Sequence, residues 1–252
     1  MQLIRPTDKE VRRFGGGGAA GGILRRKPQA APAWVPPSFA NLQLWYTVEV
    51  PSSIGHTGPT MNTWADQSAN GYTGTSSGST TYAAAGGPLG YDSIRFTPNS
   101  RIDVPSTPGL NPTTALTLLW AGRLYTASGS LFGKTGTYFD GWGFDFSGGQ
   151  VYGFVNAYNL PSTRFVPTLN TWIAMAYRYD GVNQSVWNGS VKLADTPTVG
   201  AIITNVVPVS LGAMASYYAN CDTIEAGMYN VALSDGDVNT WLSHFTADYG
   251  TP

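Results

Sequence analysis

Two acidic residues near the end of this 252-residue chain, Asp222 and Glu225, are the first candidates for catalysis. Glycoside hydrolysis needs two carboxylates that face one sugar, and on a β-strand such a pair lies at positions i and i+2 or i+4. Because Asp222 and Glu225 are three residues apart, we expect them to face opposite sides of a strand. Asp140 and Asp145 straddle a predicted turn. The acidic residues therefore offer no catalytic pair, and the sequence predicts a protein that is not an enzyme.

The histidines and the single cysteine lack the spacing of a catalytic triad or a metal site. His56 lies in a loop rich in Ser, Gly, Thr and Pro, and His244 lies on a predicted helix. Cys221 cannot form a disulfide within the chain, and we expect it to be a buried packing residue. Asp66 and Asn70 offer oxygen ligands for calcium, although an Asx turn is the preferred interpretation. We therefore expect no bound metal and no cofactor.

Aromatic residues beside Asn and Asp provide better material for a binding site. Sugar rings offer apolar C–H faces to aromatic side chains and hydroxyl groups to polar ones. Tyr and Trp also anchor protein interfaces, and ordinary core packing is the alternative role. The candidate ligand-binding residues are Tyr138, Asp140, Trp142, Asn156, Tyr158, Tyr217 and Tyr218.

The composition favours a β-rich fold, since only 12% of residues are charged, 13% are aromatic, and there are 31 Gly and 17 Pro. Short strand-like runs are separated by turn signals, of which Asp180-Gly181 and Asn188-Gly189 are typical of hairpins. No helical pattern separates these runs, so we expect a sandwich of two antiparallel sheets. The runs at 93–96 and 101–104 are expected to pair across the turn at 98–100. The other expected strands cover residues 42–47, 116–125, 131–133, 143–146, 150–157, 172–179, 184–187, 206–211 and 224–229.

One helix is predicted at the C-terminal end of the chain. Ser234 and Asp237 resemble a capping box, and Gly250 is a helix stop. An apolar stripe at helical spacing comprises Val238, Trp241, Leu242 and Phe245.

The order of these motifs resembles the concanavalin A-like jelly roll, in its laminin G-like form found in bacterial and phage surface proteins. The similarity covers residues 42–250 and rests on six stretches: Leu44-Trp45-Tyr46, Trp64 to Gly71, the pair Ile94 to Phe96 and Ile102 to Val104, Leu131 to Lys134, Asn170 to Gly189, and Asp222 to Ser234. The resemblance implies an all-β, two-sheet antiparallel jelly-roll sandwich. This fold carries lectins, hydrolases and adhesive modules, so it does not fix a function.

Residues 1–40 are expected to form a basic arm rich in Gly and Pro, which extends from a laminin G-like domain at 41–252. The arm has a formal charge of +5 and the remainder −6, which sum to the −1 of the whole chain. A basic tail on an acidic body favours docking on a negatively charged partner, and a solubilising tail is the alternative. The candidate docking residues are Arg12, Arg13, Ile23, Leu24, Arg25, Arg26, Lys27 and Trp34.

These features together favour a non-enzymatic structural protein of a virus particle, namely a bacteriophage capsid decoration or tail accessory protein. The arm would dock on capsid or tail protein, and several copies of this chain would form a homo-oligomer within the particle. We expect localisation in the virion, because neither a secretory signal nor an apolar membrane span is recognisable. The alternative is an adhesin or receptor-binding module for cell-surface polysaccharide, and a glycan hydrolase is the weakest interpretation. Nucleic-acid binding is disfavoured, because the body is acidic and no base-reading motif is present.

Overall fold

The computed structural model describes residues 34–136, 140–156, 164–197 and 200–251. The compact unit spans Val35–Pro252, so residues 35–40, which were expected in the arm, belong to it. Within this unit the Tyr229 hydroxyl donates a hydrogen bond of 2.7 Å to the carbonyl of Pro37. Of the candidate docking residues, only Trp34 is described; those from Arg12 to Lys27 lie outside the described residues.

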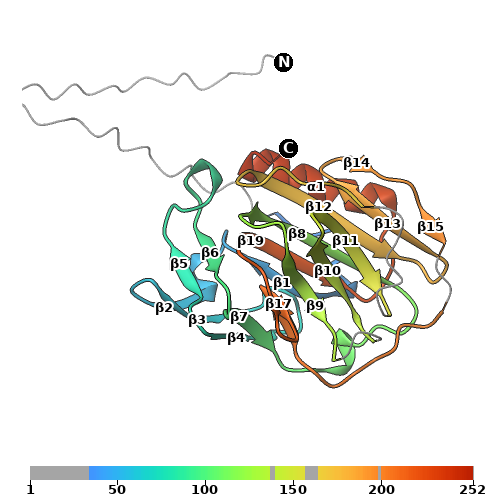
Figure 1. Cartoon of the computed structure of the whole chain (residues 1–252), viewed down its shortest axis with the longest axis horizontal. Coiled ribbons are helices and arrows are strands. Elements are labelled where there is room, and N and C mark those ends of the chain that lie inside the picture. Colours follow the sequence, from blue (N-terminus) through green and yellow to red (C-terminus); the bar gives the residue numbers. More distant parts are fainter. Residues whose placement is uncertain (1–33, 137–139, 157–163, 198–199, 252) are drawn as a thin grey trace, which may run out of the picture. The chain divides into compact units, whose positions relative to one another are not determined.

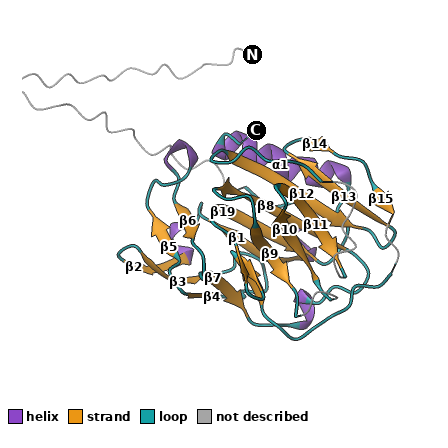
Figure 2. Cartoon of the chain, in the orientation of Figure 1, coloured by secondary structure: helices purple, strands orange, loops and turns teal. Residues whose placement is uncertain are grey.

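The fold is a two-layer sandwich of antiparallel strands with one α-helix, as the sequence predicted (Figures 1 and 2). The layer beside the helix is called the helix-side sheet here, and its strand order is β1–β19–β8–β12–β13. β1 and β6 pair with the same edge of β19, β6 with its first residues and β1 with its later ones. Its strands are β1 (Leu42–Thr47), β6 (Ser93–Phe96), β8 (Leu116–Leu124), β12 (Trp172–Tyr179), β13 (Asn183–Asn188), β14 (Val191–Lys192), β15 (Thr196–Pro197) and β19 (Cys221–Tyr229).

The other layer, here the far sheet, has the order β4–β7–β16–β9–β10–β11. Its strands are β4 (Gly74–Ser77), β7 (Arg101–Val104), β9 (Gly129–Lys134), β10 (Trp142–Ser147), β11 (Gln150–Val155) and β16 (Val209–Leu211). Two strands link the layers: β3 (Thr60–Trp64) pairs with β4 of the far sheet and with β5 (Thr81–Ala83), which in turn pairs with β6 of the helix-side sheet. β2 (Ile54–Thr57) pairs with β3, and β17 (Ala213–Met214) and β18 (Tyr217–Tyr218) form a hairpin beside β9. Short 3-10 turns lie at Phe39–Asn41, Pro51–Ser53, Pro88–Gly90 and Pro108–Leu110.

The core lies between the two sheets and follows the strand alternation. Phe144 of β10 contacts Tyr177 of β12 across the layers, with ring centroids 6.2 Å apart, and both are fully buried. Gly153 of β11 lies against the same tyrosine, so a Cβ there would come within 2.1 Å of its ring. Every second residue of these strands therefore points inward, and the residues between them form the outer faces.

The helix α1 (Asp235–Tyr249) lies along the helix-side sheet, beside β12 (Figure 1). The predicted caps are confirmed: Ser234 Oγ accepts from the amide of Asp237 at 3.1 Å, and Gly250 ends the helix with φ 65°. The predicted apolar stripe is buried, and its Trp241 packs against Gly227 and Trp45. Among the described residues, no helix has both the length and the apolar character needed to span a membrane.

The expected hairpin between 93–96 and 101–104 is wrong. β6 pairs with β5 and β19, whereas β7 pairs with β4 and β16. Both segments are strands and a turn does separate them, but at this turn the chain passes from one layer to the other. Local turn chemistry alone does not distinguish a crossover from a hairpin.

The expected orientation of Asp222 and Glu225 is also wrong, because a β-bulge interrupts β19. Thr223 pairs with Gly122 and Glu225 with Ala121, so Ile224 is the extra residue. The extra residue reverses the alternation, and both carboxylates project from the same outer face. They still form no pair, since Asp222 binds two arginines and Glu225 binds residues of β1 and α1.

The Asx turn predicted at Asp66 is confirmed by its hydrogen bonds. Oδ1 accepts from the amides of Trp45 and Ser68 at 2.7 and 2.8 Å. Oδ2 accepts from the Ser68 hydroxyl at 2.6 Å and from the amide of Tyr72 at 3.0 Å. Burial raises the pKa of this carboxyl group, and these donors oppose that rise. Asp66 thereby connects the turn to β1.

Replacing Asp66 by Ala should lower the free energy of unfolding by about 2–4 kcal/mol, because four donors lose their acceptor in a buried place. Asp66→Asn, which keeps one carbonyl oxygen, should cost less. Urea unfolding measures both, and Asp180→Ala is the matched control, since Asp180 also accepts from two turn amides but is exposed. Equal losses for Asp66→Ala and Asp180→Ala would contradict this role.

Candidate functional site

A cavity of about 200 Å³ opens on the far sheet. Arg101 and Asp103 of β7 and Ser210 of β16 supply its polar lining, while Val207 and Met214 supply apolar surface. In both strands the neighbouring residues are fully buried in the core, so these three polar side chains project outward.

Two glycines make room for Met214 at this face. A Cβ at Gly133 or Gly143 would lie 2.4 or 2.5 Å from the Met214 sulfur, so any larger residue would displace this side chain. Phe132 and Phe144, the neighbours of these glycines, are fully buried in the core. The cavity and the β17–β18 hairpin therefore lie on the outer face of the far sheet.

The polar groups of the cavity are held in one hydrogen-bonded set. Arg101 Nε donates to Asp103 Oδ2 at 2.8 Å, and the Ser210 hydroxyl donates to Asp103 Oδ1 at 2.6 Å. Arg101 Nη1 also donates to the carbonyl of Ala215 at 3.0 Å. Donors and an anionic acceptor thus stand beside apolar side chains, an arrangement that suits the hydroxyl groups and C–H face of a sugar.

Asp140 fixes the loop at the rim of this cavity. Its Oδ1 accepts from the amide of Gly136 at 2.7 Å, from the Thr135 hydroxyl at 3.2 Å and from Asn205 Nδ2 at 3.1 Å. Thr135 and Gly136 line the cavity, so this predicted ligand residue acts on the site through the loop that it supports. Nearby, burial lowers the pKa of Lys134 to about 8, although Asp140 opposes the shift.

The other predicted ligand residues are dispersed. Trp142 lies in the core, 1% exposed and edge-on to Phe132, because position 142 of β10 points inward; it is not available at the surface. Asn156 supports a loop, with Nδ2 donating to the carbonyl of Ala201 and Oδ1 accepting from the amide of Ile203. Tyr217 is 45% exposed in the β17–β18 hairpin, and its neighbour Tyr218 is half-buried. Tyr138 and Tyr158 lie outside the described residues.

The sequence reasoning missed Arg101, Asp103 and Ser210. One signal was present, since Arg101 and Asp103 alternate with the apolar Ile102 and Val104 and so share the polar face of a strand. The contribution of Ser210 depends on the pairing of β7 with β16, which joins residues far apart in the chain.

The carboxylate of Glu225 is fully buried beneath α1. Oε1 accepts from the Trp45 indole at 2.7 Å. Oε2 accepts from the hydroxyls of Tyr249 and Thr47 at 2.6 and 3.2 Å, and His244 Nε2 lies 3.4 Å away. No substrate can reach a carboxylate that is enclosed in this way, so the role of Glu225 is to join β1 and α1 by hydrogen bonds.

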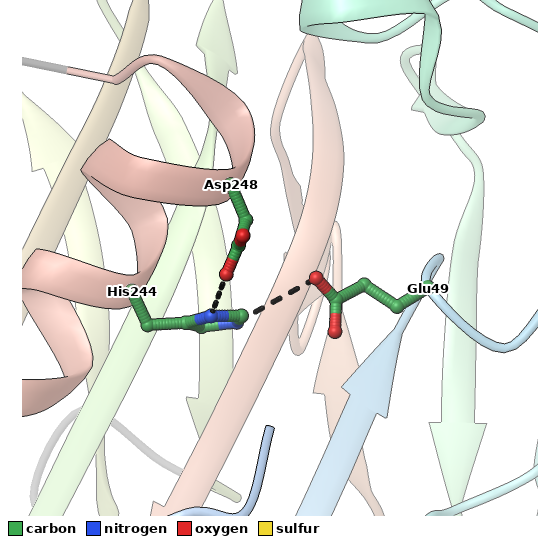
Figure 3. A group of neighbouring side chains, drawn as sticks. All are labelled: Glu49, His244 and Asp248. Atoms are coloured by element: carbon green, nitrogen blue, oxygen red, sulfur yellow. Dashed lines mark hydrogen bonds and ion pairs between the residues drawn. The ribbon is translucent and has the colours of Figure 1, made fainter. Parts of the chain in front are cut away.

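Glu49, His244 and Asp248 form a second cluster at the edge of this network (Figure 3). One potential ligand atom from each lies within 4.8 Å of the others, so the three residues could hold a metal ion. His244 Nδ1 lies 2.5 Å from Asp248 Oδ2, and Nε2 lies 3.4 Å from Glu225 and 3.9 Å from Glu49. Both ring nitrogens thus face carboxylates, and a protonated imidazole accounts for the arrangement.

The ionisation of this cluster is shifted by its surroundings. Burial, and then repulsion from Glu225, raise the pKa of Glu49 to about 7. Burial alone would lower the pKa of His244, but the carboxylates of Glu225, Glu49 and Asp248 outweigh it and raise the value. Burial raises the pKa of the Cys221 thiol to about 12, which fits its predicted packing role and not a nucleophile.

The chain was also compared with known proteins. No protein-family model matches it, and no curated protein matches its sequence. Among solved structures it is similar to botulinum neurotoxin type C, with a TM-score of 0.61 and 8% identity over 81% of this chain and 51% of the other. The binding domain of Paraclostridial Mosquitocidal Protein 1 gives a TM-score of 0.59 and 14% identity over 85% of this chain and 56% of that chain.

Domain 4 of AbnA, an extracellular arabinanase of Geobacillus stearothermophilus, gives a TM-score of 0.53 and 17% identity over 79% of this chain and 97% of the domain. The chain thus spans about half the length of the first two structures and nearly all of the third. At these identities the similarity establishes the β-sandwich fold. The closer assignment to laminin G-like phage proteins stays a prediction.

The domain should be more stable at pH 5 than at pH 8. The pKa of Glu49 is about 7 in the folded state and 4.5 in the unfolded state. Protonated Glu49 therefore adds to the free energy of unfolding in full below pH 4.5, and this stabilisation is lost as the pH rises through 7. The raised pKa of His244 acts in the same direction above pH 6.5. We expect a loss of roughly 1–3 kcal/mol across this window, measured by urea unfolding at each pH.

Glu49→Gln should flatten this dependence and stabilise the domain at pH 8, because the buried repulsion with Glu225 is removed. A stability that rises from pH 5 to pH 8, or an unchanged slope in the variant, would show that these groups do not control it. A strong rise of the unfolding midpoint with added divalent metal would instead assign the cluster to an ion.

Proposed function

We propose that this protein is a non-catalytic, lectin-like binding module that recognises carbohydrate at the cavity of the far sheet. The observation that carries the proposal is the joining of Arg101, Asp103 and Ser210 into one polar set beside Met214 and Val207. Sugar recognition needs this combination of oriented donors, an acceptor and an apolar surface. The carboxylates considered for catalysis, Asp222 and Glu225, are both bound by other residues and support no hydrolytic pair.

The similar structures support this choice of ligand. Domain 4 of AbnA was solved in complex with arabinotriose, and the type C neurotoxin depends on two ganglioside molecules for cell entry. Both are proteins that share this fold and bind carbohydrate or glycolipid. Because identities are between 8% and 17%, the site in this chain has to be argued from its own residues.

We further propose that the module belongs to a virus particle, on which the basic arm docks. The separation of charge supports this role, because residues 1–40 carry +5 and the remainder −6. The resemblance to phage surface proteins points in the same direction. In this arrangement the arm binds capsid or tail protein, and the sandwich faces outward to meet a cell-surface polysaccharide.

The full-length protein should bind at least one neutral glycan on an array, and Asp103→Asn should weaken that binding about tenfold or more. The change removes the anionic acceptor that also orients Arg101 and Ser210. Asp92→Asn is the matched control, since Asp92 binds Tyr82 and Ala85, away from the cavity. If the natural protein binds no glycan, or both variants bind equally, the cavity is not the site.

Deleting residues 1–34 should abolish attachment to the particle and leave a folded domain, because the compact unit begins at Val35. Co-sedimentation with purified particles measures attachment, and thermal unfolding measures the fold. Exchanging Arg25, Arg26 and Lys27 together for Glu should have the same effect if charge drives docking. Attachment that survives the deletion would refute the docking role of the arm.

A further inference from the structure

A row of four residues crosses the outer face of the helix-side sheet. Asp222 of β19 pairs with Arg95 of β6 on one side and with Arg123 of β8 on the other. Trp172 of β12 pairs with Arg123 and completes the row. Leu119 of β8 lies beside Gly227, near Trp241 of α1. Arg123 shares the outward face of β8 with Leu119 and lies about 13 Å farther along the strand. The row is therefore separated from this contact with the helix.

Asp222 lies beneath the two guanidinium groups and fixes both of them. Arg95 Nη1 donates to Oδ1 at 3.2 Å, and Arg123 Nη2 donates to Oδ2 at 2.6 Å. Oδ2 also accepts from the Tyr125 hydroxyl at 2.6 Å. The side chain of Asp222 is 5% exposed, whereas those of Arg95 and Arg123 are 28% and 27% exposed. The cations therefore reach the surface while their shared anion does not.

Aromatic rings hold the guanidinium planes in place. Arg95 Cζ lies 3.5 Å from the ring centroid of Tyr125. Arg123 Cζ lies 4.6 Å from the ring of Trp172 and 5.0 Å from that of Tyr125. Stacking of this kind restricts the arginine side chains before any ligand arrives, which reduces the entropy lost on binding.

The row also carries an excess of positive charge on an acidic domain. Two arginines share one carboxylate, which leaves a net charge of +1, whereas residues 41–252 carry −6 in total. Most other described basic side chains are matched by an equal number of acids: Arg101 by Asp103, Lys134 by Asp140, and Arg178 and Lys192 by Asp195 and Asp235. The row is thus a place where an added anion is favoured.

We propose that this row binds the carboxylate of an acidic sugar, such as a uronic acid within a polysaccharide. Each guanidinium group has five N–H donors and uses only some of them on Asp222 and Asn220, so the others can pair with the two oxygens of a carboxylate. The half-exposed rings of Trp172 and Tyr125 offer an apolar surface to the sugar ring. One net positive charge suits an isolated carboxylate. A polyanion as dense as nucleic acid is opposed by the acidic domain.

This site is independent of the cavity, because the two lie on the outer faces of opposite sheets. Calorimetric titration of the full-length protein with oligogalacturonate tests it, and the methyl-esterified oligomer is the matched probe. Esterification removes the charge and keeps the sugar ring. We expect binding of the acid form, at least tenfold weaker binding of the ester, and weakening of the acid form at high salt.

The double change Arg95→Gln and Arg123→Gln should weaken binding of the acid form by tenfold or more. Lys192→Gln removes a basic charge next to Asp195 and Asp235 and should leave the binding unchanged. Arg123→Lys retains the charge and can still pair with Asp222, so it remains informative if the double variant does not fold. It should weaken binding through loss of the fork, while thermal unfolding shows that the domain is intact.

Several results would overturn the assignment. They are absence of oligogalacturonate binding, equal affinity for the ester, and an unchanged affinity in the double variant or in Arg123→Lys. Inorganic phosphate that competes as well as galacturonate would reduce the row to a general oxyanion site and overturn the sugar assignment. The cavity is tested separately with neutral glycans and Asp103→Asn, so failure of one site does not imply failure of the other.

Discussion

The burial of the Glu225 carboxylate is the constraint on which the helix-side sheet depends. An ionised group without partners costs several kcal/mol in a protein interior, so the chain must bring donors to it. These donors come from β1 and from α1, which are far apart in the sequence: Trp45, Thr47 and Tyr249. Satisfying one carboxylate therefore fixes the helix against the sheet. His244 adds a titratable cation to the same network, which couples the docking of α1 to pH.

The β-bulge at Ile224 determines what the rest of β19 can do. Without the extra residue, Asp222 and Glu225 would face opposite sides of the strand, and one carboxylate would enter the apolar core. With it, both face outward, but they meet different surroundings. Residues of the helix enclose Glu225, whereas Asp222, at the other end of the bulge, forms ion pairs with two partly exposed arginines. One local irregularity thus divides a single strand face into a structural half and a half that reaches the surface.

The sequence predicted the elements better than it predicted their partners. Alternation and turn residues located most strands, and Ser234 and Gly250 gave both ends of the helix, because these signals act within a few residues. The layer change between β6 and β7 and the bulge in β19 depend on pairing with distant strands, so no local pattern reveals them. Trp142 illustrates the same limit. A loop-like neighbourhood made it a ligand candidate, yet the register of β10 turns it into the core.

The two outer faces of the sandwich differ in chemistry because different structure covers them. On the far sheet, Gly133 and Gly143 admit Met214, so the hairpin packs closely and leaves a small cavity lined by a neutralised Arg101–Asp103 pair. On the helix-side sheet, the two arginines beside Asp222 are partly exposed, and the cations there outnumber the anions. If both proposed sites bind, one polysaccharide that carries hydroxyl groups and occasional carboxylates would satisfy each of them. Its sparse charge also avoids the repulsion that the acidic domain exerts on a dense polyanion.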